Sequence, residues 1–170
     1  EHSMVIKGDR LLAITQDRTL NAYNTSNGDL IWKMVLSGYD REIRLMGESI
    51  VIMDYPEGST QFSLYVLDPA DGSQVRVISP TCQAGEYKED DFDPDSGLLF
   101  DQAENAIYLM YGFFKGCVQR YDLESGNLTW QYFQENAFSF SLPGFNPIQT
   151  DNTIYFSDEH KLFKVNQLSG

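Results

Sequence analysis

The chain has little of the chemistry on which most enzyme and metal sites depend. Its 170 residues include two cysteines and two histidines, and no pair of them has the HxxxH or CxxC spacing of a transition-metal site. A Cys/His catalytic pair is equally unsupported. No GxSxG, GxGxxG or P-loop motif is present, so the sequence gives no basis for a hydrolase, a dinucleotide-binding protein or an NTPase.

Positive charge and long apolar runs are also scarce. Lys and Arg number 12 against 25 Asp and Glu, which leaves a net charge of −13. Nucleic acids and anionic membrane surfaces attract clustered cations, so the composition argues against both as partners. No apolar run is long enough to suggest a membrane span. The 42% of hydrophobic residues is nevertheless enough for a core of ordinary size.

What the sequence does contain is an internal repeat that ends in a glycine. The pattern occurs four times, with its glycines at Gly28, Gly72, Gly126 and Gly170. The steps from 28 to 72 and from 126 to 170 are 44 residues, and the step from 72 to 126 is 54. A period of about forty residues is typical of propellers and solenoids. We predict one segment over residues 1–170, with repeat units at about 5–36, 43–79, 98–133 and 147–170.

Each repeat is predicted to contain a strand, a tight turn and a second strand. The first strand shows apolar alternation, and the glycine supplies the positive φ that the turn needs. An Asn or Asp four residues before the glycine can cap the turn with its side chain. These capping residues are Asn24, Asp68, Asp122 and Asn166.

Two repeats carry a tryptophan four residues after the glycine, Trp32 and Trp130. A ring at this position can pack over the neighbouring unit while its indole N–H finds a polar partner. We therefore expect both rings to be structural and buried between units. The second repeat has Arg76 at this position, so its packing must be different.

The segments Ala22-x-Asn24-x-x-Asn27-Gly28-x-x-x-Trp32 and Arg120-x-Asp122-x-x-Ser125-Gly126-x-x-x-Trp130 resemble the tryptophan-docking motif AxDxxTGxxxW of PQQ-like (quinoprotein-type) β-propeller repeats. The resemblance implies an all-β fold of four-stranded antiparallel blades around a central channel. About four blades are expected here, as part of a larger seven- or eight-bladed propeller. The resemblance does not imply the quinone, because most proteins with these repeats bind none.

The two ends of the segment suggest unpaired strands. The fourth repeat stops at its glycine, before the outer strand that the first repeat has at 29–34, and only four residues precede the first unit. An unpaired edge leaves backbone donors and acceptors open to other chains. We expect the segment to continue into further blades, or to associate through its open edges when isolated.

An acidic insertion between 79 and 97 is a candidate calcium site. Asp91, Asp93 and Asp95 alternate, as the first ligands of a calcium loop do. However, Pro94 interrupts the loop, and Gln102 stands where a bidentate Glu would be expected. The alternative is a solvated acidic loop.

A second long connection, predicted from Tyr132 to Pro147, is rich in aromatic residues. The rings either pack between blades or line a recognition surface. They belong to Phe133, Phe138, Phe140 and Phe145.

The two cysteines allow two interpretations, a disulfide or a pair of free thiols. Cys82 lies in the acidic insertion and Cys117 opens the third repeat motif. In an oxidising compartment a disulfide between them would pin the insertion to its blade. The alternative is two reduced, partly buried thiols.

Three function hypotheses follow. The leading one is a non-enzymatic module for protein–protein interaction or scaffolding outside the cytoplasm, in the periplasm, at the cell surface or secreted. It rests on resemblance to PQQ-like repeat proteins of the bacterial outer-membrane assembly machinery and to luminal sensors of unfolded protein. The expected partner is another protein or further blades of the same protein, with no cofactor.

Two alternatives remain open. One is a sensor domain that binds a glycan or small molecule, with calcium, in a pocket formed by loops between blades. The other is a fragment of a quinoprotein dehydrogenase. Such enzymes resemble this chain in their repeats but carry adjacent cysteines in the channel, and this chain has none.

Overall fold

The structure is a computed structural model of the 170-residue chain. It describes residues 4–38, 43–54, 56, 62–81, 97–101, 103–111, 115–135, 148–150, 152–157, 162–166 and 169. All regular secondary structure in these ranges is β, and the strands form four antiparallel sheets. The prediction of an all-β chain built from consecutive antiparallel sheets is confirmed. The chain divides into two compact units, Glu1–Thr81 and Cys82–Gly170.

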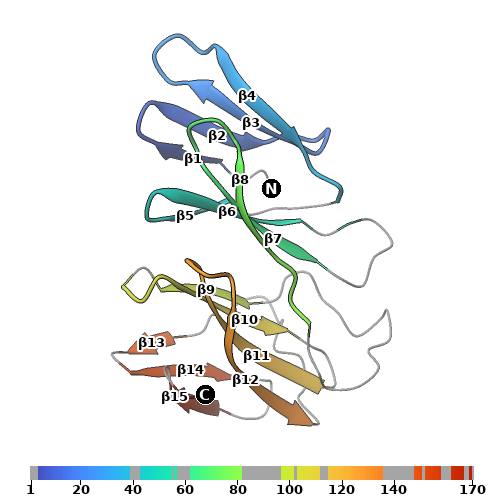
Figure 1. Cartoon of the computed structure of the whole chain (residues 1–170), viewed down its shortest axis with the longest axis vertical. Coiled ribbons are helices and arrows are strands. Elements are labelled where there is room, and N and C mark those ends of the chain that lie inside the picture. The colour runs from blue at the N-terminus through green and yellow to red at the C-terminus, as the bar shows by residue number, and fades with distance from the viewer. Residues whose placement is uncertain are drawn as a thin grey trace. The chain divides into compact units, whose positions relative to one another are not determined.

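The first unit contains two four-stranded sheets, each with its strands in chain order. In Figure 1 they are the blue and the teal-to-green sheets. The first sheet consists of β1 (Met4–Lys7), β2 (Arg10–Ile14), β3 (Thr19–Asn24) and β4 (Leu30–Val35). The second consists of β5 (Ile43–Met46), β6 (Ser49–Asp54), β7 (Ser63–Leu67) and β8 (Gln74–Ile78).

One face of the first sheet packs on one face of the second and forms the core of this unit. Leu12, Leu20 and Ala22 from the first sheet are fully buried against Ile50 and Ile52 from the second. Because successive strand residues point to opposite faces, these residues define which alternate positions of each strand face the neighbouring sheet.

The second unit repeats this arrangement. Its four-stranded sheet consists of β9 (Gly97–Asp101), β10 (Ala106–Tyr111), β11 (Lys115–Asp122) and β12 (Leu128–Glu135). The described strands of its other sheet are β13 (Ile148–Thr150), β14 (Thr153–Ser157) and β15 (Leu162–Asn166). The connection predicted to begin at Tyr132 begins later, because β12 continues to Glu135 and Phe133 pairs with Cys117.

The core of the second unit is again formed between its two sheets. Tyr108 and Val118 pack with Ile154 and Val165, and Trp130 packs against this cluster from the edge. A polar contact joins the same sheets, because the Gln149 side-chain amide donates to the Asp101 carboxylate over 2.6 Å.

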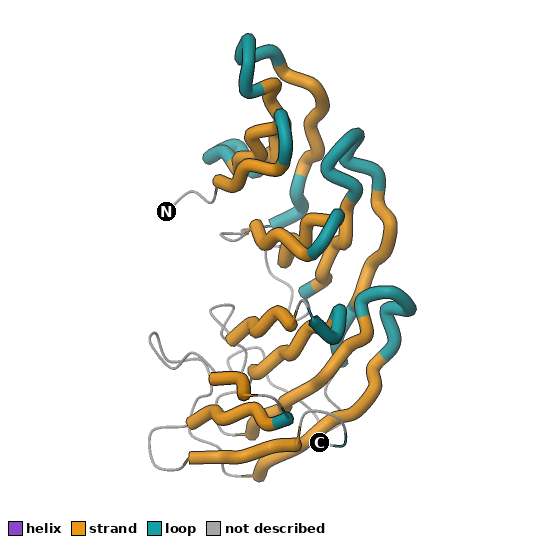
Figure 2. The backbone as a smooth tube through the Cα atoms, turned by 90° about the vertical axis from the view of Figure 1, so that its left-hand side faces the viewer, coloured by secondary structure: helices purple, strands orange, loops and turns teal. Residues whose placement is uncertain are grey.

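Three sheets share an irregularity at one repeat position. The register between the third and fourth strands shifts between Ala22 and Tyr23, between Val66 and Leu67, and between Arg120 and Tyr121. A bulge adds local twist and bends the strand. It lies just before each glycine turn, and Figure 2 shows these turns joining the outer two strands of each sheet.

The described residues contain no helix whose length and hydropathy would let it cross a membrane.

Candidate functional site

The repeated motif forms the same turn in three sheets. The backbone N–H of Gly28 donates to the carbonyl of Asn24 over 2.8 Å. Gly72 donates to Asp68 over 2.9 Å, and Gly126 donates to Asp122 over 2.7 Å. The three glycines have φ angles of 77°, 73° and 74°, in the left-handed region that glycine adopts without steric cost. The spacing of four residues is therefore a requirement of the turn.

The capping side chains complete each turn. The side-chain oxygen Oδ1 of Asn24 accepts the backbone N–H of Ser26 at 2.8 Å, and Oδ1 of Asp68 accepts that of Ala70 at 2.7 Å. In the third sheet Oδ1 of Asp122 accepts the N–H of Ser125 at 2.6 Å. Each side chain replaces a backbone partner that the turn cannot supply.

Trp32 connects the first sheet to the turn of the second. Its indole Nε1 donates to the backbone carbonyl of Pro69 over 3.1 Å. A Cβ atom at Gly72 would lie 2.7 Å from Cε3 of the Trp32 ring. The glycine of the second turn thus has two roles, because it supplies the positive φ and leaves room for the ring.

Both tryptophans are half-buried, whereas the sequence predicted rings buried between units. The reason is their place on β4 and β12, the outer strands of their sheets, where one side of the ring packs on the neighbouring sheet and another meets solvent. The Trp130 ring lies 6.0 Å from that of Tyr108. The turn that corresponds to Pro69–Gly72 in the fourth sheet lies mostly outside the described residues.

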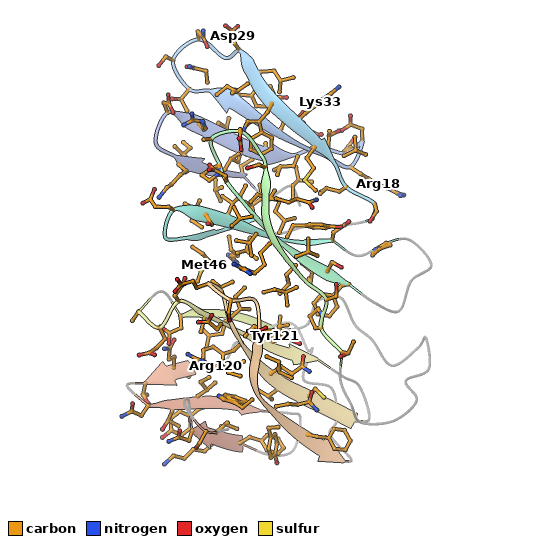
Figure 3. All side chains as sticks on the ribbon, in the orientation of Figure 1. Arg18, Asp29, Lys33, Met46, Arg120 and Tyr121 are labelled. Carbon is orange, nitrogen blue, oxygen red and sulfur yellow. The ribbon has the colours of Figure 1, made fainter. Side chains whose placement is uncertain are left out.

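Arg120 is a buried cation at a position that is apolar in the first two sheets, where it is Ala22 and Val66. Its Nε donates to the Tyr108 hydroxyl over 3.2 Å, and Nη1 donates to the Thr129 hydroxyl over 3.1 Å. Its Nη2 lies 3.9 Å from a Glu104 carboxylate oxygen. Figure 3 shows Arg120 among the side chains of the second unit. Arg120 belongs to the sequence motif, but no sequence signal indicates this network, which joins residues of three strands and a turn.

A buried carboxylate secures the connection between the two sheets of the first unit. Asp54 is 2% exposed. It accepts hydrogen bonds from the backbone N–H of Ser37 and Gly38, at 3.2 and 2.9 Å, and from the Ser37 hydroxyl at 2.5 Å. Nothing in the sequence pattern marked Asp54, because its donors precede it by 16 and 17 residues.

The predicted calcium ligands and one of the two cysteines lie in a part of the chain that the structure does not describe. Asp91, Asp93 and Asp95 lie outside the described residues, and so does Cys82. Cys117 is fully buried and disulfide-bonded. Its linkage to Cys82 stays a prediction. Within the described ranges, no three or more His, Cys, Asp or Glu side chains are grouped so that they could hold a metal ion.

The first unit exposes apolar side chains on its outer strands. Leu30 and Ile31 on β4 are 50% and 42% exposed, and Val75 and Val77 on β8 are 55% and 44% exposed. We call these four residues the outer-strand surface. Lys33 projects from β4 (Figure 3). The backbone edges of β4 and β8 have no further strand beside them among the described residues.

Comparison with solved structures identifies the fold. The chain is similar to BamB from Moraxella catarrhalis, with a TM-score of 0.64, 14% identity, and coverage of 98% of this chain and 48% of that chain. It is similar to Saccharomyces cerevisiae Sqt1, with a TM-score of 0.66, 12% identity and coverage of 98% and 46%. It is also similar to a europium-containing methanol dehydrogenase, with a TM-score of 0.65, 11% identity and coverage of 96% and 39%.

The fold is therefore of the β-propeller type, with the described sheets as its blades. The chain spans about half or less of the length of these three solved proteins. No protein-family model matches the sequence, and no curated protein sequence matches it. At identities of 11 to 14% the likeness concerns the fold and not the activity.

Proposed function

We propose that this chain is a non-enzymatic, PQQ-like β-propeller module that binds another protein outside the cytoplasm. Its repeated residues supply the scaffold. Asn24, Asp68 and Asp122 cap turns, Gly72 makes room for a ring, and Trp32 holds two blades together. The motif shared by the repeats is thus used for folding, and binding falls to residues that differ between repeats.

The observation that carries the proposal is the outer-strand surface. Edge strands are normally protected by charged side chains, because an open edge invites pairing with another chain. Here β4 and β8 present Ile31, Val75 and Val77 to solvent at 42 to 55% exposure. Among the described residues these strands have no neighbouring strand on their outer edges, and exposed apolar side chains beside such an edge favour contact with an extended apolar segment of a protein partner.

The net charge of the chain restricts the class of protein that it would bind. With a net charge of −13, the molecule attracts basic partners and repels acidic ones at long range. We therefore propose that the bound segment belongs to a protein with basic residues near its apolar ones.

The disulfide at Cys117 supports the proposed location. Disulfides persist in oxidising compartments and are rare where thiols are kept reduced. The bond that engages the fully buried Cys117 is therefore consistent with a periplasmic, cell-surface or secreted protein.

Site-specific photo-crosslinking in the source cells tests the proposal. A photo-reactive residue at Ile31, Val75 or Val77 should give the same protein adduct. A residue at Asn27, which is exposed in the turn of the first sheet, is the matched control and should not give it. Adducts of equal yield from all four positions would contradict a specific surface. Fractionation of the same cells tests the location.

A separate measurement tests the proposal that the chain is not an enzyme. The purified chain is incubated with pyrroloquinoline quinone and calcium, desalted, and examined for quinone absorbance and dye-linked alcohol oxidation. We expect neither. Stoichiometric bound quinone would favour the dehydrogenase hypothesis.

A further inference from the structure

The motif turn of the first repeat contains the pair Asn27-Gly28, the one place in the sequence where an asparagine precedes a glycine. Both residues are exposed. Asparagine is a chemically labile residue, and glycine has no side chain that would keep its backbone nitrogen away from the preceding residue. In this pair the Gly28 nitrogen can therefore reach the amide carbon of the Asn27 side chain, which is the approach that spontaneous deamidation requires.

The reaction needs water and no enzyme. The Gly28 nitrogen forms a bond to Cγ of Asn27, the bond from Cγ to Nδ2 breaks, and Nδ2 leaves as ammonia with the proton that the Gly28 nitrogen gives up. Water then opens the cyclic imide at one of its two carbonyl carbons. One opening leaves aspartate at position 27, and the other leaves isoaspartate, whose main chain is one atom longer. Both products carry a carboxylate where the chain had a neutral amide.

Three hydrogen bonds of the folded turn oppose this reaction. The attacking nitrogen, that of Gly28, donates to the Asn24 carbonyl over 2.8 Å. Asp29 holds both polar atoms of the Asn27 side chain, because Nδ2 donates to the Asp29 carboxylate over 2.7 Å and Oδ1 accepts the Asp29 backbone N–H at 3.1 Å. The Gly28 nitrogen must lose its proton and turn its lone pair toward Cγ before it can attack. The reaction therefore proceeds from an open form of the turn, which local unfolding supplies.

The product would close the turn less well than asparagine does. The second repeat shows that an aspartate can make the backbone contact, because Oδ1 of Asp71 accepts the N–H of Ser73 at 2.9 Å. The residue that follows the glycine is Ser73 in that repeat and Asp29 in the first. An aspartate at position 27 would meet the Asp29 carboxylate where the amide now donates a hydrogen bond over 2.7 Å, and two carboxylates at such a distance repel. The change is irreversible, so it leaves the turn weakened.

We propose that Asn27 is a deamidation site which the closed motif turn protects and which each opening of the turn makes reactive. Asp29 is the residue that protects it, because its carboxylate and its backbone N–H together fix the Asn27 side chain. The modification records openings of the first motif turn, since the ammonia that leaves does not return. The inference is independent of the proposed function, because the reaction involves water and this chain alone.

Deamidation kinetics of the 170-residue chain test the proposal. The folded chain and the chain unfolded in urea are incubated at neutral pH, and peptide mass spectrometry follows the replacement of the amide by a carboxylate at Asn27. The rate in the folded chain should be lower by about tenfold or more, because only the open turn reacts. Hydrogen exchange of the Gly28 amide measures the same opening, so its protection should match the ratio of the two deamidation rates.

The chain supplies its own controls for the reacting pair. Asn127 is exposed in the motif turn of the third sheet but precedes Leu128, so it should stay intact in both states over the same period. Asn27→Ser introduces the residue that the third repeat has at Ser125, and it should abolish modification of the first turn. Deamidation of Asn127 at the rate of Asn27 would overturn the assignment of the reactive pair.

Asp29→Ser tests the protecting residue. It introduces the residue that the second repeat has at Ser73, and it keeps the backbone N–H while removing the carboxylate. Deamidation of the folded variant should be about two- to tenfold faster, the range expected for the loss of one hydrogen bond, while the rate in urea stays the same. An unchanged rate in the folded variant, or equal rates in the folded and unfolded unsubstituted chain, would overturn the proposal. The second comparison stands even if Asp29→Ser fails to fold.

Discussion

The indole nitrogen of Trp32 donates a 3.1 Å hydrogen bond to the backbone carbonyl of Pro69, which lies 37 residues later in the chain. This bond joins the outer strand of one blade to the motif turn of the next. The same turn holds Gly72, whose missing side chain leaves space for the Trp32 ring. The first repeat therefore supplies the ring, and the second repeat supplies the turn on which the ring packs.

Trp32→Ala should destabilise the first unit by about 2 to 4 kcal/mol, less than the loss of a fully buried ring, because Trp32 is half-buried. Trp32→Phe keeps part of the ring contact but removes the N–H donor, so about 1 to 2 kcal/mol should be lost. Urea unfolding followed by circular dichroism measures both. Ile31→Ala, on the exposed neighbour of Trp32, is the control and should change stability little. Equal effects of Trp32→Ala and Ile31→Ala would contradict a structural role for the ring.

Gly72→Ala should cost more than Gly28→Ala, although the two glycines have nearly the same φ, 73° and 77°. Each alanine pays about 1 to 2 kcal/mol for the left-handed conformation. Alanine at 28 meets nothing within 4 Å, whereas at 72 its Cβ would lie 2.7 Å from the Trp32 ring. We expect about 1 to 3 kcal/mol of additional loss from this overlap.

A double-mutant cycle isolates this overlap. In the Trp32→Ala background the ring is absent, so the cost of Gly72→Ala should fall to that of Gly28→Ala. Additive effects of Trp32→Ala and Gly72→Ala would show that the ring and the turn do not interact. Unfolding free energies of the four chains decide the matter.

Cys82 and Cys117 should form one disulfide in protein produced in its native compartment. Mass spectrometry of peptides prepared without reduction detects the link. Reduction, or the Cys82→Ser change, should cost about 2 to 4 kcal/mol because the bond closes a long loop in the unfolded chain. Two free thiols in natively produced protein would contradict the prediction and remove the support that it gives to an extracytoplasmic location.

The Asp71 carboxylate should titrate below its ordinary pKa of 3.8, because it accepts the backbone N–H of Ser73 at 2.9 Å and interacts with the Ser73 hydroxyl. Because the pKa of Asp71 is lower in the folded state than in the unfolded state, the ionised carboxylate stabilises the folded protein above pH 3.8. This contribution to the free energy of unfolding is lost as the pH falls through the folded-state pKa. Asp71→Asn should remove this part of the acid sensitivity. Asn27 is the natural counterpart in the first turn, where Oδ1 accepts the N–H of Asp29 at 3.1 Å. NMR titration of Asp71 tests the direction of its pKa shift.

The acidic insertion should behave as solvated carboxylates and not as a calcium site. Asp91, Asp93 and Asp95 have the spacing of calcium ligands, but Pro94 and Gln102 break the ligand pattern. Calorimetric titration with calcium should therefore show no saturable binding. A one-site isotherm that is lost in Asp93→Asn would contradict this expectation and favour the glycan-binding alternative, which a glycan array with and without chelator would then test.

The sequence by itself determined the local part of this structure. Strand positions follow from apolar alternation, and the motif turn follows from the spacing of Asn24 and Gly28, because the hydrogen bonds that close the turn join residues two to five apart along the chain. Such contacts form wherever the short segment forms. The recurrence of the segment at a period of 44 and 54 residues then indicated stacked sheets.

Only the tertiary structure decided which residues meet across the sheets. Three contacts depend on how separate strands and sheets pack. They are the hydrogen bond from Trp32 to Pro69, the hydrogen bonds of the buried Arg120 to hydroxyl groups, and the hydrogen bond from Ser37 to Asp54. The same repeat position is buried at Leu20 and exposed at Leu162, at 0% and 74%, although the residue is leucine in both. The physical reason is that a side chain is buried only where a second surface covers it. The sequence pattern of one strand describes that strand alone and not the surface that covers it.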